Sequence, residues 1–133
     1  MKVLVTGAGG QLGRAVRKAA SGREFDCIFT DVVSGDDIVA LDVTDSDAVR
    51  EFLLAHKVDA VVNCAAYTDV NAAEDNEEKA SLINSYAPSV MAEAARNAGA
   101  VLVHISTDYV FGGQKNTPYS EDDVPMPLNA YAR

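Results

Sequence analysis

Short apolar segments alternate with amphipathic ones along the chain. Five runs rich in Val, Ile, Leu and Ala are typical of strands that are buried on both faces of a parallel sheet. They cover residues 2–5, 26–30, 38–41, 60–63 and 101–106. The segments between them predict helices over 11–20, 46–56 and 79–97, each with one apolar face. This alternation indicates an α/β fold in which helices connect parallel strands right-handedly.

The ends of two predicted helices carry recognisable stop and start residues. Asp45 is placed to cap the helix over 46–56, and Gly99 is placed to end the helix over 79–97 in the left-handed conformation. Pro88 lies inside that last helix. It predicts either a kink or a first turn that begins near Ala87, and the sequence leaves both open.

Size and charge narrow the class of protein. The chain has 133 residues, 48% of them hydrophobic, which suffices for one core. Its net charge of −9 argues against binding nucleic acid or an anionic membrane. There is no long apolar span and residues 1–8 do not look like a signal peptide, so we expect a cytoplasmic protein. We expect Cys27 and Cys64 to be reduced core residues, and we see no metal-ligand cluster.

A glycine-rich loop, Gly-Ala-Gly-Gly-Gln-Leu-Gly over residues 7–13, joins the first strand to the first helix. Residues without side chains let backbone N–H groups approach a phosphate, and the N-terminus of the following helix favours an anion. Its position between a strand and a helix makes the loop a candidate site for the pyrophosphate of a dinucleotide.

Further candidates follow the later strands. Asp31 lies where an acid bonds the adenosine ribose in such folds, which favours NADH over NADPH, but it is equally well a strand-end residue that caps a turn. Asp42 and Val43 are placed to flank the adenine. The sequence Asn-Cys-Ala-Ala-Tyr over 63–67 ends the fourth strand, at the edge of the sheet where ligands bind.

The fifth strand ends in hydroxyl groups at Ser106 and Thr107, and a long polar loop over 108–129 separates it from Tyr131. Loops of that length in compact domains are usually functional. On residue chemistry alone, Thr107 is more simply a strand-end hydroxyl and Tyr131 a surface aromatic. His104, inside the strand, is more simply a hydrogen-bonded core residue than a ligand.

Four motifs in order, TGAGGQLG, NCAAYTDV, ISTDYVFGG and PLNAYAR, resemble the extended short-chain dehydrogenase/reductases, most closely the dTDP-4-dehydrorhamnose reductases. The resemblance spans residues 1–133. It implies a Rossmann-like, doubly wound parallel sheet, here with about five strands. It also implies that 1–133 is an NAD(P)-binding domain without its C-terminal substrate-binding part.

The resemblance implies roles for the motif residues, with NADPH or NADH as cofactor. Thr107 would polarise the ketone of a sugar, and Tyr131 would supply its proton. The cofactor-binding residues it implies are Gly7, Gly10 and Gly13 at the pyrophosphate, Gln11 and Leu12 through their backbones at the helix start, and Ala65, Ala66 and Tyr67 along the nicotinamide ribose.

A tyrosine acts as an acid near neutral pH only if a cation lowers its pKa from about 10. In the family that cation is a lysine four residues after the tyrosine, whereas this sequence ends at Arg133. We therefore expect a fragment that does not turn over substrate alone. With one sheet edge uncovered, we also expect it to be weakly stable or self-associating.

The function implied by the resemblance is NAD(P)H-dependent reduction of the 4-keto group of dTDP-4-dehydro-L-rhamnose to dTDP-L-rhamnose. The expected partner is a nucleotide sugar, and a homodimer is the assembly considered. Two alternatives stay open. One is a non-catalytic subunit resembling the regulatory subunit of methionine adenosyltransferase, and the other is a sugar-nucleotide epimerase or dehydratase.

Overall fold

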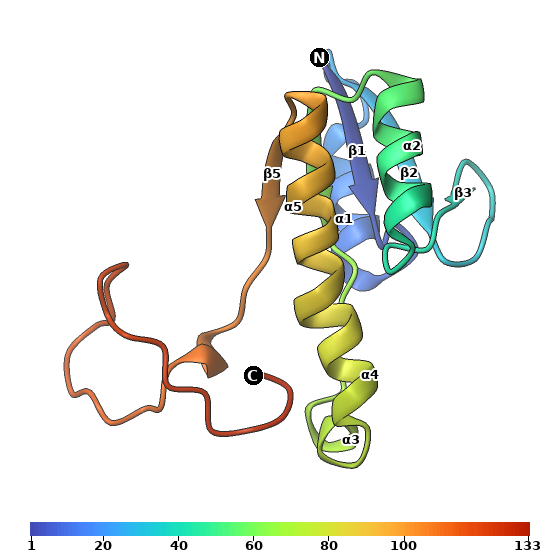
Figure 1. The fold of residues 1–133 in the computed structure, drawn as a ribbon. Helices are drawn as coiled ribbons and strands as arrows, with labels where there is room; N and C mark the ends of the chain where they lie inside the picture. The colour runs from blue at the N-terminus through green and yellow to red at the C-terminus, as the bar shows by residue number, and fades with distance from the viewer.

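Five parallel strands form one sheet in the computed structural model, which describes all residues from 1 to 133. Their order is β3-β2-β1-β4-β5, so the first strand is central and the chain winds outward in both directions from it. Helix α1 lies on one face of the sheet, and α2 and α5 lie on the other (Figure 1). This confirms the predicted doubly wound α/β fold. The strands are β1 Lys2–Thr6, β2 Asp26–Asp31, β3 Val39–Ala40, β4 Ala60–Asn63 and β5 Val101–His104.

The helices confirm the predicted pattern and add two short elements before the last one. Asp45 caps α2 by accepting hydrogen bonds from two backbone N–H groups, and Gly99 ends α5 with a φ of 69°, both as predicted. The α-helices are α1 Gln11–Ala20, α2 Ser46–His56, α3 Val70–Asp75, α4 Glu77–Ser81 and α5 Ala87–Ala98, and a 3-10 turn covers Asp108–Val110.

A π turn over Leu82–Tyr86 connects α4 to α5 and accounts for Pro88. The N–H of Ala87 donates to the carbonyl of Leu82, five residues back, and Tyr86 and Ala87 both keep helical backbone angles. Pro88 then occupies the first turn of α5, directly after the π turn. Of the two predictions, the first turn near Ala87 is confirmed, although the chain is already helical before it.

The hydrophobic core lies between the sheet and the pair α2 and α5. These helices pack together over it in front of the sheet (Figure 1). Twelve buried residues make up this cluster: Leu4, Leu41, Val43, Val49, Leu53, Val58, Val61, Ala87, Val90, Met91, Ala94 and Ala95.

Two predicted strands are shorter in the structure. β3 has two residues because it pairs with β2 only at Thr30 and Asp31. β5 pairs with β4 over four residues and ends at His104, so 105 and 106 continue beyond the sheet. On this edge strand, the side chains of Val101 and Val103 are 64% and 47% exposed. The predicted weak stability or self-association stays a prediction.

The segment after β5 runs away from the sheet and then returns to lie near α4 (Figure 1). The N–H of Ala130 donates to Glu74 Oε1 at 2.9 Å, and Arg133 pairs with Glu77 at 2.9 Å. Ala130 also joins a small apolar cluster with Ala73 and Ala80. The end of the described chain is therefore fixed against α3 and α4.

Candidate functional site

The glycine loop is shaped mainly by close backbone contacts. Gly7 has a φ of +62°, and a Cβ there would lie 2.5 Å from the backbone nitrogen of Ala65. A Cβ on Gly13 would lie 2.1 Å from the carbonyl oxygen of Gly7. Gly10 differs, because a Cβ there would meet only the Gly7 carbonyl, at 3.2 Å. Gly7 and Gly13 are thus required by packing, while a Cβ on Gly10 would make a single tight contact with a backbone oxygen.

The glycine loop borders a pocket of about 830 Å³ at the carboxyl ends of the strands. Eight of the predicted cofactor-binding residues line it, while Gln11, Leu12 and Gly13 do not. The predicted lining residues are Gly7, Gly10, Asp31, Asp42, Val43, Ala65, Ala66 and Tyr67. Gly9 and Cys64 also line the pocket and lie inside the predicted motifs, whereas sequence reasoning missed Val32, Val33, Leu41, Thr44, Lys79, Leu82 and Ile83.

Asp31 connects the end of β2 to the glycine loop. Its Oδ2 accepts the N–H of Gly9 at 2.9 Å, and its Oδ1 accepts the N–H of Val32 at 2.8 Å. Asp31 therefore caps the turn after β2, as one of the two interpretations predicted. Each carboxylate oxygen has a further lone pair, and Asp31 lines the pocket, so the ribose interpretation stays a prediction.

A polar network joins the carboxyl ends of β1, β4 and β5 next to the pocket. Asn63, at the end of β4, accepts the Thr6 hydroxyl at 2.6 Å and the N–H of Ala65 at 3.0 Å. Its amide lies 3.0 Å from Nδ1 of His104. Partial burial lowers the pKa of His104, and a neutral ring accepts the amide proton of Asn63 at Nδ1. His104 is hydrogen-bonded as predicted, but its side chain is exposed rather than in the core.

The wall of the pocket at Tyr67 is held by Asn84, which lies in the π turn. Asn84 Oδ1 accepts the N–H of Tyr67 at 2.8 Å, and Asn84 Nδ2 donates to the Tyr67 carbonyl at 3.0 Å. This two-point contact fixes the peptide of Tyr67. Tyr67 also packs against the small cluster of alanines that Tyr131 contacts. The wall of the pocket and Tyr131 therefore pack against the same cluster.

Thr107 and Tyr131 lie beyond the pocket, on the segment that follows β5. The Thr107 hydroxyl accepts the N–H of Tyr109 at 3.2 Å and has only a long contact of 3.4 Å to Asp108. Tyr109 meets Tyr131 edge to face, with ring centroids 5.9 Å apart. The structure therefore brings Tyr131 and the turn that starts at Thr107 together through Tyr109, a residue that sequence reasoning missed.

Both cysteines are reduced and only partly buried, so the expectation that they are core residues is wrong. Cys27 lies in β2 and Cys64 follows β4, where it lines the pocket. Desolvation raises the pKa of both thiols.

A family profile described as the RmlD substrate binding domain matches residues 1–133, the whole of the chain. The chain belongs to the RmlD family, that of the dTDP-4-dehydrorhamnose reductases. A dTDP-4-dehydrorhamnose reductase of Mycolicibacterium smegmatis is 41% identical over 99% of the chain and 38% of the relative. A probable dTDP-4,6-dihydroxy-2-methyloxan-3-one 4-ketoreductase of Streptomyces antibioticus is 48% identical over 100% of the chain and 43% of the relative. The chain thus spans less than half of these relatives.

Solved structures of RmlD relatives have the same fold. A dTDP-4-dehydrorhamnose reductase from Clostridium acetobutylicum superposes with a TM-score of 0.90 at 43% identity, over 99% of this chain and 45% of that one. A dTDP-4-dehydrorhamnose reductase from Bacillus anthracis, solved in complex with NADP, superposes with a TM-score of 0.87 at 34% identity, over 98% of this chain and 45% of that one. A UDP-glucose 4-epimerase from Stenotrophomonas maltophila, at 22% identity and a TM-score of 0.86, shares the fold.

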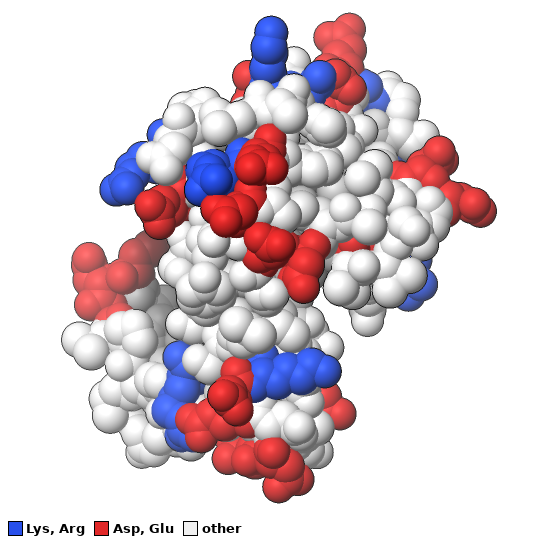
Figure 2. Space-filling view, turned by 45° about the vertical axis from the view of Figure 1, so that its right-hand side comes forward, with Lys and Arg blue, Asp and Glu red and all other residues white.

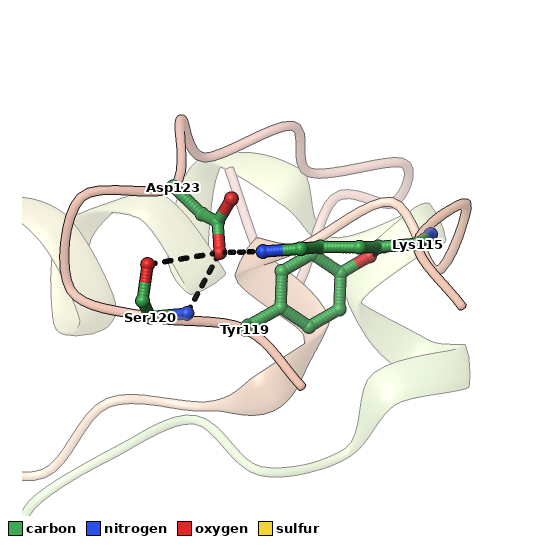
Figure 3. Close-up of polar contacts among 4 residues, drawn as sticks. All are labelled: Lys115, Tyr119, Ser120 and Asp123. Atoms are coloured by element: carbon green, nitrogen blue, oxygen red, sulfur yellow. Dashed lines mark hydrogen bonds and ion pairs between the residues drawn. The ribbon is translucent and has the colours of Figure 1, made fainter. Parts of the chain in front are cut away.

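In this RmlD family member, the segment between Thr107 and Tyr131 includes a loop with its own polar centre (Figure 3). Asp123 Oδ2 accepts from Lys115 Nζ at 2.5 Å and from the N–H of Ser120 at 2.7 Å. Hydrogen bonds from Lys115 and Ser120 hold the pKa of Asp123 below its usual range. Lys115 lies over the ring of Tyr119, which stacks on Phe111 at 4.2 Å. The loop therefore has a defined conformation without regular secondary structure.

Charge on this RmlD family member is predominantly acidic. On the face drawn in Figure 2, basic side chains lie among acidic ones rather than in one continuous patch. None of the helices is long and apolar enough to cross a bilayer, and no group of three His, Cys, Asp or Glu residues is placed to hold a metal ion. A second, larger hollow of about 950 Å³ lies beside α1, β2 and β3, away from the carboxyl ends of the strands, and contains no predicted site residue.

Proposed function

We propose that this chain is the NAD(P)-binding part of an enzyme that reduces the 4-keto group of dTDP-4-dehydro-L-rhamnose to dTDP-L-rhamnose. The observation that carries the proposal is the pocket at the carboxyl ends of the strands, whose lining includes Gly10 and seven other predicted cofactor-binding residues. The membership of the RmlD family and the NADP complex of the Bacillus anthracis relative support the choice of cofactor.

The residues at the pocket fit a dinucleotide. Gly10 precedes α1, whose first turn contains no acidic residue and no side-chain cap, so its N–H groups are free to bind a phosphate. Val43 and Ile83 provide apolar walls for a base, and Ala65 and Ala66 leave room for a ribose. When bound, the cofactor supplies the hydride for the carbonyl carbon.

Thr107 and Tyr131 are the groups proposed to act on the sugar ketone. As the carbonyl carbon gains a hydride, negative charge develops on its oxygen, and hydroxyl donors lower the barrier to that change. Thr107 has a hydroxyl proton held only by a long contact, so it is free to donate to the oxygen. Tyr131 gives its hydroxyl proton to the same oxygen, which completes the alcohol.

The test is a fluorescence titration of NADH and NADPH into the full-length gene product, followed by a turnover assay with dTDP-4-dehydro-L-rhamnose. Gly10→Val adds a side chain to a residue that lines the pocket, so we expect cofactor binding to be lost, and thermal unfolding of the variant shows whether it still folds. Gly35→Val is the matched control, because Gly35 has nothing within 4 Å of its Cβ position and a φ outside the left-handed region.

In the same assay, we expect Tyr131→Phe and Thr107→Val to bind cofactor normally and to lose most turnover, on the order of 100-fold or more, because each removes a hydroxyl donor. Unchanged cofactor affinity in Gly10→Val would contradict the pocket assignment. Cofactor binding without any turnover in the unsubstituted protein would instead favour a non-catalytic subunit.

A further inference from the structure

Lys79 is the only basic residue among those that line the pocket, and Asp31 and Asp42 are the two acidic ones. Asp31 is already directed toward the N–H groups of Gly9 and Val32. A dinucleotide brings a diphosphate with negative charge into a pocket of an acidic protein, and desolvated anions need compensating donors or charge. The pocket therefore needs a cation near the phosphates, and Lys79 is placed to supply it.

Lys79 is held at the pocket by an aromatic ring. Its Nζ lies 5.9 Å from the ring centroid of Tyr67, within the range of a cation–π contact. The Tyr67 peptide is in turn fixed by the two hydrogen bonds from Asn84. Lys79 makes no ion pair, and its neighbour Glu77 is paired with Arg133. Its ammonium group is thus positioned at the pocket with its charge uncompensated.

Lys79 lies on a helix face that lines the same pocket as the glycine loop. Lys79, Leu82 and Ile83 follow one another at the spacing of one helix face, and all three line the pocket. The glycine loop contributes Gly7, Gly9 and Gly10 to the lining of the same pocket, and α1 begins directly after Gly10 without a side-chain cap. An anion in this pocket therefore lies in a space that is lined both by the glycine loop and by the one ammonium group.

We propose that Lys79 binds the diphosphate of the dinucleotide cofactor and so completes the phosphate site that the glycine loop begins. This inference rests on the proposed cofactor binding. The ammonium of Lys79 forms charge-assisted hydrogen bonds to the phosphate oxygens, which are stronger than neutral ones. The 2′-phosphate of NADPH could accept the same hydrogen bonds from Lys79. The experiment therefore distinguishes the diphosphate from the 2′-phosphate as the group that Lys79 binds.

The experiment compares the unsubstituted full-length protein with Lys79→Met and Lys79→Arg, by titration with NADH, NADPH, ADP and adenosine. Lys18→Met is the matched control, because Lys18 lies on α1 and lines the other hollow. We expect Lys79→Met to weaken binding of NADH, NADPH and ADP by about 10-fold each, the loss of one charge-assisted contact. Adenosine binding should be unchanged, and Lys79→Arg should retain most of the affinity. The salt dependence of NADH binding should become shallower in Lys79→Met alone.

Equal NADH affinity in Lys79→Met and in the unsubstituted protein would overturn the inference and leave the proposed function intact. A loss confined to NADPH would also overturn it, because the lysine would then serve the 2′-phosphate. Absence of NADH and NADPH binding in the unsubstituted protein would overturn the proposed function and this inference with it. Circular dichroism of each variant shows whether a loss of binding is caused by unfolding. We expect the variants to fold, because Lys79 is exposed.

Discussion

Replacement of Asn63 by alanine tests the polar network under the pocket. Asn63 is 1% exposed, and its Oδ1 accepts both the Thr6 hydroxyl and the N–H of Ala65. Thr6 is also 1% exposed, so in Asn63→Ala its hydroxyl is left without this partner in a place that water does not reach.

The size of the effect follows from these two donors. A buried polar group without a partner costs about 1–3 kcal/mol. The Thr6 hydroxyl should cost the full amount, and the half-buried N–H of Ala65 the lower end of it. We therefore expect Asn63→Ala to lower the free energy of unfolding by about 2–4 kcal/mol, a large share of the roughly 5–15 kcal/mol of a typical domain.

Thr6→Val provides the matched control in a double-mutant cycle. It removes the donor but leaves Asn63 Oδ1 with the N–H of Ala65, so we expect a loss of only about 1 kcal/mol. In the Thr6→Val background, Asn63→Ala should cost less than in the unsubstituted protein, because no hydroxyl is left unpaired. Urea unfolding of the four proteins measures this. A cost below about 1 kcal/mol for Asn63→Ala, or strict additivity in the cycle, would refute the reasoning.

Two further predictions concern the glycine loop and the loop in Figure 3. Gly13→Ala would put a Cβ 2.1 Å from a backbone oxygen, so we expect it to lower the free energy of unfolding by about 3 kcal/mol, measured by urea unfolding, whereas a neutral effect would show that α1 is free to shift. The lowered pKa of Asp123 means that its contribution to folding is complete above the ordinary carboxyl pKa and is lost as the pH falls through the lowered value. In an NMR titration, Lys115→Met should raise the Asp123 pKa, and an unchanged pKa would contradict the assignment of its cause.

The regular elements were predictable from the sequence because their apolar patterns are strong. β1 and β4 are mostly buried apolar runs that end at the polar residues Thr6 and Asn63. Asp45 and Gly99 fix the start of α2 and the end of α5 through local backbone geometry and hydrogen bonds. The short β3 was less predictable, because its length depends on pairing with β2 and on nothing within its own residues.

The candidate site was predictable where a motif names a residue and less so where folding brings residues together. The glycine loop and the segment 65–67 were found from their motifs, while Asn63 was noted only as the first residue of a motif. Its role depends on Thr6 and His104, which lie on two other strands. The conformation of the loop that contains Asp123 depends on side-chain contacts, and such contacts leave no periodic pattern in the sequence.

The π turn at Leu82–Tyr86 sets the rotational phase between the two ends of one long helical segment. Before the turn, the segment presents Lys79 to the pocket, and after it the segment presents Met91 to the core. Each residue added to an α-helix rotates the residues after it by about 100°. Deletion of a single residue in this turn would thus leave the helix intact but rotate its pocket-facing side chains away from the site. Insertions and deletions at this point are therefore constrained by geometry, even where the residues themselves are free to vary.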